Sequence, residues 1–148
     1  MQSSNLKTFF KDVADLHYVV QRNWDNLPDT LEFDGHEDLD VLVSDAEVDD
    51  FLSILDSYPE IKAVTDVRTP KDGYYPFKLA MKMLKNREQV RGFWAPDAEA
   101  HFLSLYYHGE VHKEENKYTE KLRDVLFTAY PPTKCVDPGV GYYVTDRD

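Results

Sequence analysis

Apolar positions along this chain follow two different periods, and the period predicts the element that each segment forms. Side chains that recur at helical spacing predict helices, and short β-rich or alternating runs predict strands. Helices are predicted to begin near residues 4, 45, 76, 96 and 117, and strands are predicted at residues 18–21, 38–44 and 61–67. This order predicts an α/β or α+β fold, in which helices flank a small mixed β-sheet.

The length of the chain predicts a single domain over residues 1–148, because one hydrophobic core commonly serves a chain of this size. Within it, we expect a core at about residues 15–92, a helical C-terminal part at about 93–130 and an irregular tail at 131–148. The chain is 42% hydrophobic, which is enough to build a real core.

The charge and the cysteine content of the chain exclude several classes of function. The formal net charge of −11 argues against binding to nucleic acid or to an anionic membrane surface, since both carry negative charge. The one cysteine, Cys135, excludes an internal disulfide and a cysteine-based zinc cluster. Residues 1–10 contain no apolar signal-peptide region, and no apolar stretch is long enough to span a bilayer. We therefore expect a cytoplasmic protein that does not associate with membranes.

The most informative segment is the strand predicted at residues 38–44, which begins with two carboxylates. Asp38 and Asp40 are two positions apart, so in a strand they point to the same face. Adjacent like charges are unfavourable unless a cation lies between them, and Mg²⁺ prefers such oxygen ligands. The alternative is a strand that is entered through a polar, solvated turn.

Residues 35–43 resemble the metal-binding strand of the nucleotidyltransferase superfamily, which has the DNA polymerase beta-like fold. In that family a helix and a strand lead into a Gly-Gly or Gly-Ser turn, and two aspartates separated by one apolar residue follow about nine to thirteen residues later. Here the turn falls at residues 22–24, and thirteen residues separate Trp24 from Asp38. The turn of this chain departs from the pattern because it contains no glycine.

Further short segments occur in the order found in nucleotidyltransferase-like domains associated with cell-surface polysaccharide and glycosyltransferase proteins. These segments are residues 66–68, 72–75, 83–87, 102–108 and 112–113, and the resemblance covers roughly residues 15–143. It implies a minimal nucleotidyltransferase-like fold with additional C-terminal helices. It also implies Mg²⁺-dependent transfer of a nucleotidyl or phosphoryl group to a small molecule or glycan, in polysaccharide biosynthesis.

The resemblance implies that Asp38, Asp40 and Asp66 are the catalytic carboxylates and hold Mg²⁺ or Mn²⁺. Asp66 lies in the next predicted strand, which makes it the best candidate for the third ligand. The alternative for Asp66 is an ion pair with Arg68 and no metal, because these residues are also two positions apart.

A nucleoside triphosphate is the substrate that the resemblance implies, and five residues are candidates to contact it. The alternative for Arg22 is a surface ion pair. For His108, the spacing to His112 also permits a zinc site, although no third ligand is evident. The candidate contacts to the nucleotide are Arg22, Asn23, Arg68, His108 and Lys113.

Two other functions fit the same residues. One is a non-catalytic module of the same fold that binds a nucleotide or a partner protein, which the missing glycines favour. The other is a metal-dependent hydrolase of phosphoesters. The sequence leaves open the donor nucleotide, the acceptor and the oligomeric state.

Overall fold

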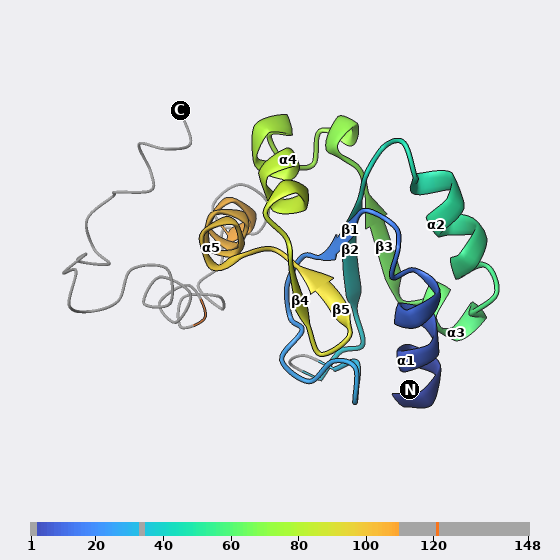
Figure 1. Cartoon of the computed structure of the whole chain (residues 1–148). Coiled ribbons are helices and arrows are strands. Elements are labelled where there is room, and N and C mark those ends of the chain that lie inside the picture. Colours follow the sequence, from blue (N-terminus) through green and yellow to red (C-terminus); the bar gives the residue numbers. More distant parts are fainter. Residues whose placement is uncertain (1–2, 33–34, 110–120, 122–148) are drawn as a thin grey trace. The chain divides into compact units, whose positions relative to one another are not determined.

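The computed structural model of this chain describes residues 3–32, 35–109 and 121. By its internal contacts the chain divides into two compact units, residues 1–97 and residues 98–148. The first unit contains all the strands that are described, and Figure 1 labels its elements. Each unit is considered by itself below.

A three-stranded mixed sheet forms the centre of the first unit. Strands β1 (Tyr18–Val20), β2 (Leu39–Val43) and β3 (Thr65–Arg68) lie in the order β1-β2-β3. Strand β2 pairs with β1 antiparallel and with β3 parallel. The predicted α+β class and the mixed sheet are therefore confirmed, as is the expectation that the three predicted strands share one sheet.

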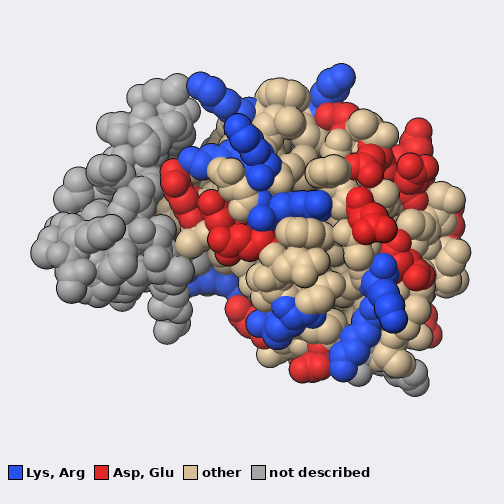
Figure 2. All heavy atoms as spheres, viewed as in Figure 1, with Lys and Arg blue, Asp and Glu red and all other residues tan. Residues whose placement is uncertain are grey.

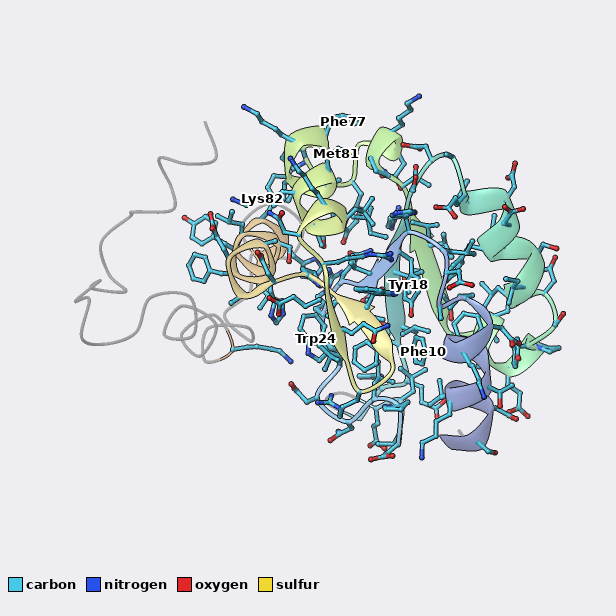
Figure 3. All side chains as sticks on the ribbon, viewed as in Figure 1. Phe10, Tyr18, Trp24, Phe77, Met81 and Lys82 are labelled. Carbon is cyan, nitrogen blue, oxygen red and sulfur yellow. The ribbon has the colours of Figure 1, made fainter. Side chains whose placement is uncertain are left out.

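One face of this sheet packs on helices α1 (Ser3–Asp12) and α2 (Val48–Leu55). Apolar side chains alternate along β1 and β2, and those on this face join the aromatic side chains of the helices in one core. The ring centroids of Phe10 and Tyr18 are 6.5 Å apart, and Figure 3 labels both side chains. The period-2 pattern of the strands and the period-3.6 pattern of the helices thus meet in this core.

The opposite face of the sheet is covered by helix α4 (Phe77–Lys85), which contacts β1 and β2. Its inward side buries the side chains of Ala80, Met83 and Leu84. Its outward side exposes two large apolar side chains, Phe77 and Met81 (Figure 3). Because both faces of the sheet are covered, every residue of β2 is buried.

A hairpin of β4 (Glu88–Val90) and β5 (Phe93–Ala95) completes the first unit, and β5 contacts β1. Arg91 and Gly92 form its two-residue turn with φ of 46° and 94°, the left-handed backbone that such tight turns require. The Arg91 side chain donates hydrogen bonds to the carbonyl oxygens of Leu27 (2.7 Å) and Trp24 (2.6 Å). The hairpin therefore also anchors the loop that follows β1.

The strand predicted at residues 61–67 is corrected by the structure. Ile61 belongs to a short helix, α3 (Pro59–Lys62), and β3 begins only at Thr65. Pro59 occupies the first turn of α3, where its missing N–H breaks no hydrogen bond. Proline therefore starts a helix here, and the apolar side chain of Ile61 is buried by helical packing.

The beginnings of two other elements also differ from the prediction. Asp38 lies in the loop before β2, which starts at Leu39. Helix α2 begins at Val48, after the N-cap residue Glu47 and without a side-chain cap, and thus later than the start predicted near residue 45.

In the second unit the structure describes helix α5 (Ala98–Tyr107), at the place predicted for a helix that opens after Pro96. The helix predicted from residue 117 and the tail lie outside the described residues. Among the residues that are described, no helix has both the length and the apolar character needed to cross a bilayer.

Candidate metal centre

Three carboxylates converge on the sheet face that α4 covers. Asp40 in β2 and Asp66 in β3 are direct neighbours in the parallel register, so their side chains lie on the same face. Asp38 precedes Asp40 by two positions. One carboxylate oxygen of each of the three residues lies within 4.8 Å of the others. Asp66, the candidate that the next predicted strand suggested, therefore lies beside the other two carboxylates.

Asp40 is the carboxylate at the centre of this group, and it is the buried one. Its residue is 8% exposed, whereas Asp38 and Asp66 are exposed. Burial raises the pKa of Asp40 above its ordinary value, and the neighbouring Asp38 and Asp66 raise it further, while Arg22 and Arg68 lower it. The ionised form of Asp40 is thus disfavoured in the metal-free protein, and a cation at the cluster would favour it.

Arg22 forms a buried ion pair with Asp40. Its Nη2 lies 3.5 Å from Oδ2 of Asp40, and its side chain is 5% exposed. Its Nη1 donates to the hydroxyl oxygen of Tyr75 (2.5 Å) and to Oε1 of Gln21 (3.1 Å). The alternative of a surface ion pair is therefore wrong, because Arg22 is fixed inside the protein beside the central carboxylate.

A tight turn after β3 brings Tyr75 to this network. A 3₁₀ turn (Pro70–Asp72) follows the strand, and the Asp72 carboxylate accepts hydrogen bonds from the backbone N–H groups of Thr69 (3.1 Å) and Tyr74 (2.8 Å). Gly73 follows with φ of 80°, in the left-handed region that glycine adopts readily. The chain thereby turns back, and Tyr75 becomes buried with its hydroxyl donating to Oε1 of Gln21 (2.8 Å).

Gln21 extends the row of polar side chains to the first strand. Its backbone N–H donates to the carbonyl oxygen of Asp40 (2.8 Å), which continues the antiparallel register of β1 and β2 by one residue. Gln21, Asp40 and Asp66 are therefore cross-strand neighbours on one face of the sheet. The polar row spans all three strands.

Asn23 takes the left-handed backbone conformation, with φ of 62°. Asparagine is among the few residues other than glycine that adopt this conformation with little strain. Asn23 therefore gives the turn at residues 22–24 a positive φ, which glycine more often supplies. The Asn23 side chain is buried, and its Oδ1 has no hydrogen-bond partner among the described residues.

Arg68 does not pair with Asp66 in the part of the chain that the structure describes. Its guanidinium instead lies 4.2 Å from the centroid of the Tyr74 ring, in a cation–π contact. Both side chains are partly exposed. The alternative that Arg68 neutralises Asp66 is wrong, and Arg68 presents a positive charge beside the carboxylates.

The remaining predicted contacts are placed as follows. His108 is buried in the second unit, and Lys113 and His112 lie outside the described residues.

Charged side chains are distributed unevenly over the surface of the first unit. Helix α4 carries lysine side chains, and acidic side chains gather around α2 (Figure 2). The α4 lysines are Lys78, Lys82 and Lys85.

The residues of this cluster fit a hard divalent cation. Three carboxylates supply anionic oxygen ligands at short mutual distances, which is the ligand type that Mg²⁺ and Mn²⁺ prefer. Exposure of Asp38 and Asp66 leaves the cluster open to solvent on one side, as a site that keeps metal-bound water or substrate oxygens requires. Asp38, Asp40 and Asp66 are the residues that would hold the ion.

Comparison of the chain with models of protein families, with curated proteins and with solved structures gave no match. The resemblance to nucleotidyltransferases therefore stays a prediction from the motifs. The function proposed below is inferred from the geometry of the three carboxylates.

Sequence reasoning missed two members of the site, Gln21 and Tyr75. Gln21 could have been found from the register, because an antiparallel strand that ends near the aspartates places a residue beside them. Tyr75 gave no such signal, because aromatic residues near a helix start usually serve the core. Its role depends on a turn that brings together residues 53 positions apart.

Proposed function

We propose that this chain is a Mg²⁺- or Mn²⁺-dependent nucleotidyltransferase-like enzyme of the cytoplasm. It would transfer a nucleotidyl or phosphoryl group from a nucleoside triphosphate to a small molecule or glycan, as in polysaccharide biosynthesis. The observation that carries this proposal is the convergence of Asp38, Asp40 and Asp66 from a loop and two adjacent strands. Two exposed carboxylates and one buried carboxylate at this spacing repel one another unless a cation joins them.

The protein residues have distinct tasks in this reaction. An oxygen of the acceptor attacks a phosphorus atom of the donor, and the bond from that phosphorus to its leaving oxygen breaks. Asp38, Asp40 and Asp66 would hold a divalent ion, which would neutralise charge on the phosphates and activate the attacking oxygen. Arg68 is placed to attract the anionic donor, because its partly exposed guanidinium has no carboxylate partner among the described residues.

The direct test uses nucleoside triphosphates labelled at the α- or the γ-phosphate, with Mg²⁺ or Mn²⁺ and a panel of sugar and amino-sugar acceptors. We expect metal-dependent release of pyrophosphate or a labelled acceptor. Asp66→Asn should abolish it, whereas Asp49→Asn, a change of an exposed carboxylate on α2, should leave it intact. Activity that survives Asp66→Asn would contradict the proposal. Release of inorganic phosphate from simple phosphoesters alone would instead indicate a hydrolase.

A non-catalytic nucleotide-binding module of the same fold is the second candidate. The buried pair of Arg22 and Asp40 favours it, because the pair engages an oxygen that a catalytic metal would otherwise use. Binding of labelled nucleotide, followed by analysis of the nucleotide recovered after incubation with the acceptors, separates the two candidates. A module binds nucleotide in a metal-dependent way and returns it unchanged with every acceptor.

A further inference from the structure

Arg22 occupies the position of a resident cation beside the carboxylates. It is buried, its Nη2 lies 3.5 Å from Oδ2 of Asp40, and hydrogen bonds from Nη1 to Tyr75 and Gln21 hold it there. A guanidinium stays protonated at every physiological pH, so this positive charge is permanent. These contacts on both sides of the guanidinium keep its positive charge beside Oδ2 of Asp40.

In two-metal sites the ions lie about 3.5–4 Å apart, so a cluster of three carboxylates must balance the charge of both ions at once. Here the central carboxylate is shared between Arg22, which lies 3.5 Å from its Oδ2, and the cluster with Asp38 and Asp66. The three carboxylates carry three negative charges, and the Arg22 guanidinium paired with the central one carries one positive charge. One divalent ion therefore neutralises this group, and a second ion would make it net positive.

A separate observation points to a ligand with oxygen atoms at this site. Gln21 is fully buried in register with Asp40 on the same face of the sheet. Its Oε1 must face Arg22, because a guanidinium only donates hydrogen bonds, and this fixes the orientation of the amide. Its Nε2 then has no hydrogen-bond partner among the described residues. A buried amide donor needs an acceptor, which water or a phosphate oxygen held by a cation would supply.

From these contacts we infer that the site takes one divalent cation per chain, with the Arg22 guanidinium in place of a second metal ion. This inference rests on the proposed metal-dependent function. Arg22 is then a positioning residue, because it sets how many ions the carboxylates bind. Its role does not depend on a contact with the phosphates of the substrate.

The test is a count of bound Mn²⁺ ions. Free Mn²⁺ is measured by electron paramagnetic resonance during titration of the full chain, and the bound ions per chain follow by difference. We expect one ion in the wild type and two in Arg22→Gln, which removes the charge and keeps a polar side chain. The first ion should also bind about tenfold more tightly to this variant, because a repelling charge is gone. Circular dichroism checks that the variant is folded.

Two matched variants complete the count. Arg22→Lys keeps the positive charge and should bind one ion, which tests the inference even if Arg22→Gln does not fold. Arg68→Gln removes a positive charge that rests on Tyr74 and not on Asp40, so it should also bind one ion. Two ions in the wild type or in Arg22→Lys would overturn the inference and leave the metal-dependent function standing. An unchanged count and affinity in Arg22→Gln would do the same. No ion in the wild type would remove both.

Discussion

Asp40 and Asp66 lie directly opposite each other on adjacent parallel strands, and Asp40 is the more buried of the two. Burial and the nearby carboxylates raise the pKa of Asp40 in the folded protein above its ordinary value of about 3.9. The folded state therefore holds the proton more strongly than the unfolded state does. As the pH rises from the unfolded pKa through the raised folded pKa, the free energy of unfolding that this group contributes decreases.

Asp40→Asn should consequently stabilise the metal-free protein at pH values above the unfolded pKa of Asp40, because the asparagine has no carboxylate to ionise. The raised pKa already includes the attraction of Arg22, so the loss of that ion pair is outweighed. The variant should lose the stabilisation that Mn²⁺ or Mg²⁺ gives to the wild type. Thermal unfolding across a pH series, with a chelator and with added metal, measures both effects. Asp49→Asn is the control, and equal stabilisation of Asp40→Asn by metal would contradict the assignment of Asp40 as a ligand.

The sequence predicted the structure well where a periodic pattern of apolar and polar positions lies within one short segment. The alternation at residues 38–44 predicted β2 and the shared face of Asp38 and Asp40, because a strand has a fixed period of two. The proximity of Asp66 followed from placing the next strand beside β2. The prediction failed at Ile61, because a short buried apolar run fits a helix as well as a strand and Pro59 decided between them.

Contacts between distant segments could not be predicted in this way. The burial of Arg22 depends on Tyr75, and Tyr75 reaches it through a turn built by Asp72 and Gly73. None of these residues has a pattern that indicates its partner. The left-handed backbone of Asn23 could not be predicted from the sequence either, because only the structure shows its φ.

The hydroxyl of Tyr75 links Gln21 and Arg22 in a buried network, so its removal should destabilise the protein. Tyr75→Phe leaves Arg22 with one fewer acceptor and should decrease the free energy of unfolding by about 1–3 kcal/mol. Urea denaturation measures this change. Tyr58→Phe is the matched control, because its hydroxyl donates to Asp12 at the surface and its loss should change stability by less than about 1 kcal/mol. Equal effects of the two changes would show that the Tyr75 network is not special.

The backbone of Asn23 predicts a difference between two substitutions that both remove its side chain. Asn23→Gly keeps access to positive φ, whereas Asn23→Ala must adopt it with a Cβ. We expect the alanine variant to be less stable than the glycine variant by about 1 kcal/mol, although glycine usually destabilises a folded chain through backbone entropy. Denaturation of the two variants under the same conditions tests this, and a more stable alanine variant would contradict a left-handed residue here.

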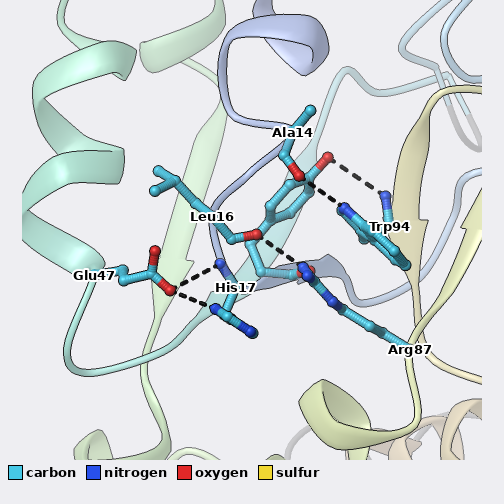
Figure 4. Close-up of polar contacts among 7 residues, drawn as sticks. Ala14, Leu16, His17, Glu47, Arg87 and Trp94 are labelled. Carbon is cyan, nitrogen blue, oxygen red and sulfur yellow. Dashed lines mark hydrogen bonds and ion pairs between the residues drawn. The ribbon is translucent and has the colours of Figure 1, made fainter.

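The Arg87 side chain connects the hairpin to the segment before the first strand. It contacts a backbone carbonyl oxygen of that segment and the ring of a tryptophan in the hairpin (Figure 4). The Arg87 guanidinium lies 3.8 Å from the centroid of the Trp94 ring and donates to the carbonyl oxygen of Leu16 (2.8 Å). Trp94 in turn donates from Nε1 to the carbonyl oxygen of Ala14 (3.0 Å). These contacts tie the hairpin to the segment between α1 and β1.

Arg87→Met keeps an unbranched apolar side chain beside Trp94 but loses the charge and the hydrogen bonds, and it should decrease the free energy of unfolding by roughly 1–3 kcal/mol. Arg87→Lys should fall between this variant and the wild type, because an ammonium keeps the cation–π attraction but not the planar geometry of the guanidinium. Fluorescence of Trp94 in a Trp24→Phe background reports the same contact directly. Its emission should change in Arg87→Met before any global unfolding, because the ring loses the charge above it. Identical emission and stability in all three proteins would mean that the hairpin is held by its apolar contacts alone.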